Sequence, residues 1–404
     1  MFKNLSLKVI LFGFIFTFFS SFGQSFFLGL FNTSIRNELN ISHGQFGSIY
    51  ASATIISSLV LIWFGKKIDE FKLFNYSFVV IFLLFFSTFF FSLISNVYLL
   101  VIAIFLMRFS GQGLMSHTAT TAISRYFSKS RGKSLSAIWL GLSSAEFILP
   151  ILIVFLISLF SWRTVWQFIS LTTIIFLPLV ILNTIKEVTF SSRESNEATS
   201  EQKFDVKQWK RVEVIKDFRF YIISLNMLAM PWIITGVFVY QSFISESKLW
   251  DTYTIPKSFM IYSISSVLTL FFSGFLVDKF TSRKLIPIMN IPLFLAVIVL
   301  FYFNHEISAF IFLGLVGISN GLANVLGSST WAEIYGVKFI GSIKALTTAL
   351  MVFSTAFGTA VFGLLIDKGF SIENIAFIAG VYILLSLILL IMIRNTLEPV
   401  NLKK

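Results

Sequence analysis

The chain has 404 residues, of which 56% are hydrophobic and only 12% charged, and its formal net charge is +12. So few polar residues cannot coat a soluble globule of this size, which excludes the soluble classes and indicates a protein embedded in lipid. The absence of cysteine excludes disulfides and thiol chemistry, and three scattered histidines offer neither a metal site nor a catalytic triad.

Twelve apolar segments follow one another, each long enough to cross a hydrocarbon core of about 30 Å. They are too long for barrel strands, and backbone groups in lipid must bond internally, so we expect helices. The first run extends too far for a signal peptide. The segments cover roughly 8–32, 45–64, 74–94, 97–124, 134–160, 164–185, 218–244, 255–277, 285–303, 307–331, 340–366 and 374–393.

The two sets of six segments are related by an internal repeat. Residues 65–69 and 274–278 share the pattern Gly-x-x-x-Asp at an offset of 209 residues, and Gly113 and Gly321 are 208 residues apart. Paired hydrophobic halves of this kind are typical of secondary transporters. We therefore predict an all-α membrane protein with two pseudo-symmetric six-helix bundles, residues 1–187 and 216–404, joined by a hydrophilic interdomain loop, 188–215.

The basic residues are segregated between the two sides of the predicted membrane. With the N-terminus inside, 25 of the 31 lysines and arginines fall on the cytoplasmic side, five fall outside and Arg108 lies within a span. This asymmetry predicts that both termini are cytoplasmic. It also accounts for the positive charge without nucleic acid as a partner.

Several short motifs carry a family resemblance. Span four contains Arg108-Phe109-Ser110-Gly111-Gln112-Gly113, and Ser161-Trp162-Arg163 lies between spans five and six. Together with the paired Gly-x-x-x-Asp segments, they make the chain similar to the major facilitator superfamily over nearly its whole length. They also resemble its bacterial monocarboxylate and oxalate/formate type branch. The first loop motif departs from the family pattern, because Glu70 replaces a basic residue and the second glycine is missing.

The resemblance implies gating roles for the loop motifs and for residues near them. Asp69 would cap span eleven and Asp278 span five of the opposite half, since a carboxylate stabilises a helix N-terminus. Glycine would allow the helices to approach closely. The alternative is a set of static salt bridges worth about 0–1 kcal/mol each. The expected gating set is Gly65, Asp69, Arg125, Gly274, Asp278, Arg283 and Glu333.

Arg108 is the most informative single residue, because a guanidinium at that depth costs at least about 2.5–3.5 kcal/mol on insertion scales. That cost implies a partner or an aqueous cavity. α-Helical spacing places Gln112, Met115 and Ala119 on the face of Arg108, and a planar guanidinium suits a carboxylate or phosphate. The alternative is that Arg108 only bonds backbone carbonyls of span one.

Glu146 is the other ionisable residue at depth, within span five. A carboxyl in a poorly hydrated site can load and release a proton near neutral pH, which makes Glu146 the candidate proton carrier. The alternative is a protonated glutamate hydrogen-bonded to a neighbouring helix. His117, about half a turn out of phase with Arg108, is expected to pack between helices rather than to relay protons.

The remaining polar residues lie on spans one, seven and ten, whereas spans three, six, nine and twelve are nearly featureless and predicted to face lipid. Thr17, Ser20 and Gln24 share a face of span one, and Pro231 can break span seven. Interhelical amide bonds are the alternative explanation for each polar residue. The candidate solute contacts besides Arg108 and Gln112 are Gln24, Asn226, Gln241, Asn320, Asn324 and Trp331.

These observations predict a secondary active transporter in the cell inner (plasma) membrane, moving a small organic solute by alternating access. An anion such as a monocarboxylate is favoured, with protons as the coupling ion and the monomer as the functional unit. The alternatives are an exporter of lipophilic or cationic compounds and a non-transporting membrane sensor. An enzyme is disfavoured by the missing catalytic cluster, and no Walker loop or dinucleotide fingerprint indicates a cofactor.

Overall fold

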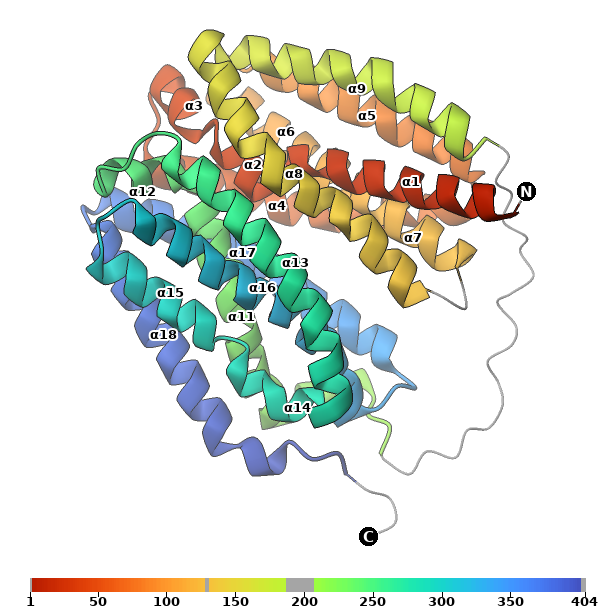
Figure 1. Ribbon diagram of the computed structural model, residues 1–404, viewed down its shortest axis with the longest axis vertical. Helices are drawn as coiled ribbons and strands as arrows, with labels where there is room; N and C mark the ends of the chain where they lie inside the picture. The colour runs from red at the N-terminus through yellow and green to blue at the C-terminus, as the bar shows by residue number, and fades with distance from the viewer. Residues whose placement is uncertain (1, 128–130, 187–206, 401–404) are drawn as a thin grey trace. The chain divides into compact units, whose positions relative to one another are not determined.

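The computed structural model describes residues 2–127, 131–186 and 207–400, and within them the regular structure is helical (Figure 1). In this part of the chain, twelve helical stretches are long and apolar enough to cross a membrane. They follow the predicted segments closely, from Leu5–Gly29 to Ile372–Met392. The predicted all-α fold with twelve spans is confirmed.

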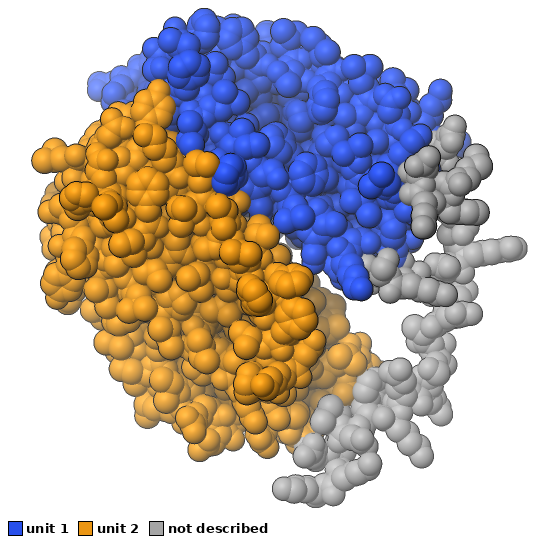
Figure 2. Space-filling model, in the orientation of Figure 1, with its two compact units in different colours: residues 1–195, 238–243 blue, residues 196–237, 244–404 orange. Residues whose placement is uncertain are grey.

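The described residues form two compact units (Figure 2). Unit 1 comprises residues 1–195 with 238–243, and unit 2 comprises 196–237 with 244–404. The short segment 238–243, from the second half of the sequence, therefore belongs to unit 1. Most of the predicted interdomain loop lies outside the described residues, and its last part, 207–215, belongs to unit 2.

Unit 1 is built from helices that pack in antiparallel and parallel pairs. α1 packs along α8, α5 along α9, and α4 against α6 (Figure 1). Its elements are α1 (Phe2–Ser20), η1 (Ser21–Gly23), α2 (Ser25–Gly29), α3 (Asn32–Leu39), α4 (His43–Gly65), η2 (Lys66–Asp69), α5 (Leu73–Ser92), α6 (Val97–Met107), η3 (Arg108–Met115), α7 (Ser116–Tyr126), α8 (Arg131–Leu159) and α9 (Trp162–Thr184).

Unit 2 repeats this plan with fewer interruptions. α13 packs along α16, and α15 packs against both α16 and α18. Its elements are α10 (Arg211–Ile215), α11 (Phe218–Val239), α12 (Gln241–Ser247), α13 (Thr254–Phe280), α14 (Ser282–Leu285), η4 (Ile286–Ile288), α15 (Ile291–Tyr302), α16 (Ile307–Tyr335), α17 (Ile340–Asp367), α18 (Ile372–Met392) and η5 (Arg394–Thr396).

Short polar signals set the helix ends between the apolar runs. Ser42 and Gln45 form a capping box at the start of α4, because each side chain bonds the backbone N–H of the other residue. Asn96 and Ser161 cap α6 and α9 in the simpler way, through one side-chain acceptor each. Along α5, Phe78, Phe82 and Phe86 are exposed at helical spacing, as expected for a scaffold helix that faces lipid.

The segment 238–243 is attached to unit 1 by polar contacts to the chain between α2 and α4. Asn32 Nδ2 donates to the carbonyl of Val239 at 2.7 Å, and the hydroxyl of Tyr240 donates to the carbonyl of His43 at 2.8 Å. The predicted seventh span, 218–244, therefore ends at Val239. Pro231, which the sequence offered as a residue able to break this span, lies inside a continuous α11.

The last described residues of the chain pack back onto unit 2. Nη1 of Arg219, at the start of α11, donates to the carbonyls of Thr396 at 2.9 Å and Glu398 at 3.2 Å. The backbone N–H of Lys207 donates to the carbonyl of Val400 at 2.8 Å. These bonds fix both the entry into unit 2 and its C-terminal segment at one end of the bundle.

Candidate functional site

The first membrane span is interrupted in its second half. α1 ends at Ser20, a single 3₁₀ turn covers Ser21–Gly23, and Gln24 adopts an extended conformation before α2 begins. The prediction that Thr17, Ser20 and Gln24 share one helical face is therefore wrong, because the helix stops between them. The extended residue leaves the carbonyl of Gly23 outside the helical ladder, where it needs another donor.

Span four is irregular at the matching place. Residues Arg108–Met115 form a π-helix between α6 and α7, and such wide turns occur frequently at functional sites. Gly23 and Gly111 let the two irregular segments touch, since a Cβ atom on Gly111 would lie 2.7 Å from the nitrogen of Gly23. The wider π-helical turn changes the angular spacing on which the predicted shared face of Arg108, Gln112, Met115 and Ala119 depended.

Arg108 lies at this contact and is 4% exposed. Its Nη1 donates to the carbonyl of Gly23 at 3.1 Å, and its Nε donates to Oγ1 of Thr54 on α4, also at 3.1 Å. The guanidinium carbon lies 5.2 Å from the ring centroid of Tyr50, one turn earlier on α4. Among the residues that the structure describes, no carboxylate lies within 4 Å of Arg108, so dipoles and one aromatic ring are all that balance its charge there.

Gln24 and Gln112 lie on the two backbone segments that meet beside Arg108. Both side chains are half-buried, and neither amide makes a hydrogen bond to any residue in 2–127, 131–186 or 207–400. The backbone contact between Gly23 and Gln112 brings the neighbouring chain segments together. The structure therefore groups three of the predicted solute contacts, Gln24, Arg108 and Gln112, around one helix break.

Glu146 lies on α8, which packs along α1 and reaches η1 and α2. The side chain is 8% exposed and has no hydrogen-bond or ion-pair partner in the described part of the chain. The predicted alternative of a hydrogen bond to a neighbouring helix is therefore not observed. A buried, unpartnered carboxyl at the level of the helix break is suited to taking up and releasing a proton.

The predicted contacts on α11 and α16 have different environments. Asn226 is fully buried, its Nδ2 lies 3.4 Å from Oγ of Ser386, and its carbonyl accepts from Asn290 at 2.6 Å. Asn320 donates to Ser266 on α13 at 2.9 Å. These bonds hold helices of unit 2 together. Asn324, one turn further along α16, is exposed and has no partner among the described residues.

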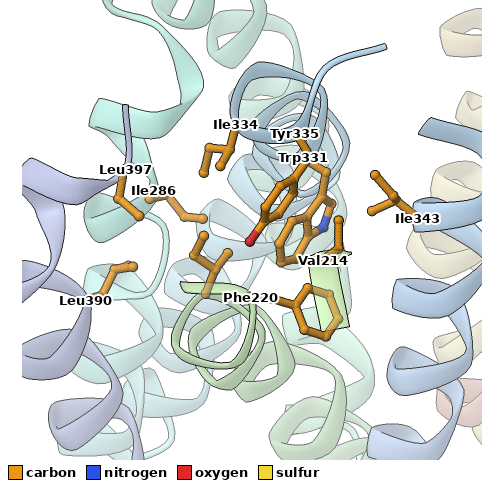
Figure 3. Close-up of a cluster of buried hydrophobic side chains, with 10 residues drawn as sticks. Val214, Phe220, Ile286, Trp331, Ile334, Tyr335, Ile343, Leu390 and Leu397 are labelled. Atoms are coloured by element: carbon orange, nitrogen blue, oxygen red, sulfur yellow. The ribbon is translucent and has the colours of Figure 1, made fainter. Parts of the chain in front are cut away.

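Gln241 and Trp331 are both engaged in packing. Gln241 donates to the carbonyls of Phe26 at 2.8 Å and Phe238 at 2.9 Å, within unit 1. Trp331 is 2% exposed and belongs to an apolar cluster of unit 2, with its ring 5.3 Å from that of Phe220 and stacked on Tyr335 at 5.9 Å (Figure 3). Its position favours a core role over solute contact.

The first Gly-x-x-x-Asp segment is fastened within its own unit. Asp69 forms an ion pair with Arg125 at the end of α7, and Arg125 also donates to the carbonyl of Ile68 at 3.4 Å. Gly65 lies against His117, whose Nε2 is 3.1 Å from the Gly65 carbonyl, and a Cβ atom on Gly65 would lie 3.2 Å from that nitrogen. This glycine therefore makes room for the imidazole ring.

The second segment is held differently. The carboxylate of Glu333, on α16, accepts from the backbone N–H of Ser282 at 2.8 Å and of Arg283 at 3.1 Å, and so caps α14. Asp278 is exposed and forms no ion pair in the part of the chain that the structure covers. Gly274 has open space on its Cβ side. The two repeats thus use different bonds at corresponding places.

Within the described ranges, no group of three histidine, aspartate or glutamate residues is arranged to hold a metal ion. Arg108 and Glu146 are buried and form no ion pair within those ranges, unlike the buried pair of Asp217 and Arg219. Both lie on elements, η3 and α8, that pack against the first span.

Sequence comparison gives the family of this fold. The model of the Major Facilitator Superfamily matches residues 13–256 and 258–404, which cover both halves. The chain belongs to the major facilitator superfamily. Among curated proteins, none matches this superfamily member by sequence.

Solved structures agree with that assignment. A bacterial homolog of the human lysosomal transporter Spinster, in an inward-facing and unoccupied conformation, is 14% identical, with 98% of this chain and 97% of that chain covered and a TM-score of 0.69. The nucleoside transporter NupG is 13% identical, with 98% and 99% covered and a TM-score of 0.72. At these identities the likeness shows the fold alone. The superfamily member described here is a multi-pass membrane protein with a transporter fold, and its family points to transport rather than catalysis.

Two residues of this superfamily member that contact Arg108 were missed in the sequence. Tyr50 and Thr54 lie four residues apart on α4 and therefore face the same way. The sequence suggested only backbone carbonyls of span one as partners of Arg108, and the structure has one such bond, to Gly23. The available signal was the four-residue spacing of Tyr50 and Thr54, which places two polar side chains on one face of the span.

Proposed function

We propose that this protein is a secondary active transporter that moves a small organic anion, such as a monocarboxylate, by alternating access of its two units. The observation that carries the proposal is the buried guanidinium of Arg108, which has no carboxylate within 4 Å among the described residues. A buried ionic group is stable only when its charge is compensated, and arginine does not lose its proton. A transported anion would supply the missing charge.

The surroundings of Arg108 support an organic anion in particular. Nε and Nη1 are held by Thr54 and Gly23, so the guanidinium is fixed in orientation before a ligand arrives. The half-buried amides of Gln24 and Gln112 lie on the adjoining segments and can orient polar groups of the rest of the solute. Broken spans with free backbone groups are a recurring feature of transporter binding sites.

The test of this function is ligand binding by purified protein with and without the Arg108 side-chain charge. Ligand at a hundredfold excess over Kd stabilises a protein by about 2.7 kcal/mol, so a small carboxylate should raise the melting temperature of the wild type. Arg108→Gln should remove that rise and abolish uptake into vesicles. Lys66→Gln, which removes an exposed charge of the same unit, is the matched control and should change neither result. Retained uptake in Arg108→Gln would take Arg108 out of the site.

We further propose that Glu146 carries the coupling proton, since it is buried with no partner in the described part of the chain and its helix packs against the broken first span. Glu146→Gln should keep exchange of labelled solute across the membrane, because the solute site is intact. It should lose accumulation driven by a proton gradient. Accumulation equal to that of the wild type would contradict this role for Glu146.

The distribution of charge supports a location in the plasma membrane with both termini in the cytoplasm. One chain contains both halves of a transport pathway, so we propose a functional monomer with the lipid bilayer as its surroundings. An exporter of lipophilic cations would draw on Glu146 and Trp331, but the packed environment of Trp331 weakens that alternative. A membrane sensor remains the second alternative, and solute accumulation in vesicles separates it from a transporter.

A further inference from the structure

The hydroxyl group of Tyr50 has no acceptor for its proton among the residues that the structure describes. Tyr50 is 1% exposed, and its hydroxyl oxygen is buried with no hydrogen-bond partner of good geometry among the described residues. It lies close enough to Arg108 for an electrostatic interaction. A guanidinium has donors only, so Arg108 cannot accept the Tyr50 proton.

The guanidinium of Arg108 has further N–H groups beside Tyr50. Nε and one N–H of Nη1 are committed to Thr54 and Gly23, while Nη2 makes no hydrogen bond of good geometry within the described ranges and the side chain of Tyr50 lies beside the guanidinium. The ring of Tyr50 lies over the guanidinium, with its centroid 5.2 Å from Cζ. Unused N–H groups and an unused O–H group therefore meet at one buried place.

A set of donors without an acceptor calls for an anionic acceptor. Buried polar groups in proteins are nearly always hydrogen-bonded, and an exception needs an explanation. A carboxylate offers two oxygens that accept several bonds and fits the planar edge of a guanidinium. Because Thr54 occupies Nε, the edge that remains for such a ligand is the one formed by Nη1 and Nη2.

We propose that Tyr50 is a ligand-binding residue, which donates its hydroxyl proton to the same carboxylate that Arg108 binds. This assignment rests on the proposed transport of an organic anion and narrows the substrate to carboxylates. α4 would then serve the site twice, with Thr54 orienting the guanidinium and Tyr50 completing the ligand's hydrogen bonds. Both residues lie on one helix face, so they move together.

The test uses Tyr50→Phe, which keeps the ring over Arg108 and removes only the hydroxyl. The probes are acetate, lactate, pyruvate, succinate, inorganic phosphate and sulfate, added to purified full-length protein, with Kd taken from the shift in melting temperature. We expect the wild type to bind a carboxylate and Tyr50→Phe to raise its Kd about tenfold, equivalent to 1.4 kcal/mol. The ligand-free melting temperature of the variant should be unchanged or higher, because an unsatisfied buried hydroxyl is lost.

Tyr76→Phe is the matched control. Tyr76 is a buried tyrosine of the same unit, and its hydroxyl already donates to the carbonyl of Phe64 at 3.4 Å. This variant should leave Kd unchanged.

The outcomes separate this inference from the proposed function. If Arg108→Gln loses binding while Tyr50→Phe binds like the wild type, Tyr50 is not a ligand residue and the anion transporter stands. A lower ligand-free melting temperature in Tyr50→Phe with unchanged Kd would assign the hydroxyl to a bound water. Stabilisation by phosphate or sulfate but by none of the carboxylates would overturn the ligand class, and no stabilisation by any probe would overturn both proposals.

Discussion

Gly23 lets the first span touch the π-helix of the fourth, and the contact leaves no room for a side chain. A Cβ atom at this position would meet the backbone oxygen of Met107 and the backbone nitrogen of Gln112. Backbone atoms cannot move aside as a flexible side chain can. The break in the first span and the bond from its carbonyl to Arg108 therefore depend on this glycine.

Gly23→Ala should destabilise the protein and displace the first span from Arg108. Overpacking of a tight contact costs about 1–3 kcal/mol, so the melting temperature in detergent should fall measurably. Gly341→Ala is the control, because open space lies on the Cβ side of Gly341 in α17 and alanine favours a helix. Equal melting temperatures for the two variants would contradict the tight contact.

Residues show most clearly what the sequence could predict. The positions of Arg108 and Glu146 inside apolar segments could be predicted from the sequence, and the cost of a charge there marked both residues as functional candidates. Their partners were not readable, since Thr54 approaches from another span and the π-helix changes the angular spacing around Arg108. Local periodicity describes regular helices, whereas this site is built where two helices are irregular.

At the scale of elements, α3 is tied to the beginning of α9 by Glu38. Its carboxylate accepts from Nε1 of Trp162 at 2.8 Å and forms an ion pair with Arg163, which also donates to the carbonyl of Ser92 at 2.8 Å. The hydrogen bond from Arg163 holds the pKa of Glu38 below its usual value. The Ser-Trp-Arg motif thus links α3, the end of α5 and the start of α9 within unit 1.

Glu38→Gln should lower the melting temperature slightly at neutral pH, since the ion pair is lost. A carboxyl with a depressed pKa stabilises the fold above its unfolded pKa, about 4.3 for glutamate, and this contribution disappears as the pH falls through the folded value. The difference between wild type and variant should therefore be constant from pH 8 to 6 and shrink below about pH 4.3. Glu70→Gln, which breaks the exposed Lys67 pair, should show less difference. A Glu38 effect that changes between pH 8 and 6 would contradict the assignment.

The sequence predicted the membrane-spanning helices more reliably than it predicted the contacts of single residues. The twelve spans were predictable from length and hydropathy because lipid demands long apolar helices. Residues 21–24, where the first span breaks, contain no proline, and Pro231 does not break α11. The break also involves contacts with span four, at Gly111 and Arg108, and the composition of the first span alone does not contain these contacts.

For the whole molecule, the proposed transport by alternating access would give the two loop motifs unequal roles in the change between inward-facing and outward-facing states. Asp69 is already paired with Arg125 inside unit 1, whereas Asp278 has no ion-pair partner in the described ranges. We therefore expect Asp278 to be the acid that forms state-dependent contacts.

Asp278→Asn should change the ratio of the two states, measured by labelling single cysteines introduced on each side of the membrane. Asp69→Asn, the repeat-equivalent variant, should lower the melting temperature and alter the labelling ratio less. If both variants label like the wild type, Asp278 is a static surface residue.

The contacts that hold the two loop motifs also show how the two halves of the sequence differ. Arg125 and Glu333 are 208 residues apart, the same offset that relates Gly113 to Gly321, and they carry opposite charges. Arg125 holds an aspartate side chain, and Glu333 holds two backbone N–H groups. Replacing Glu333 alone by the arginine found at the corresponding place of the first half would set one donor against two others, the N–H groups of Ser282 and Arg283. The two repeats therefore cannot exchange their residues at this position without losing the contacts that hold their loops.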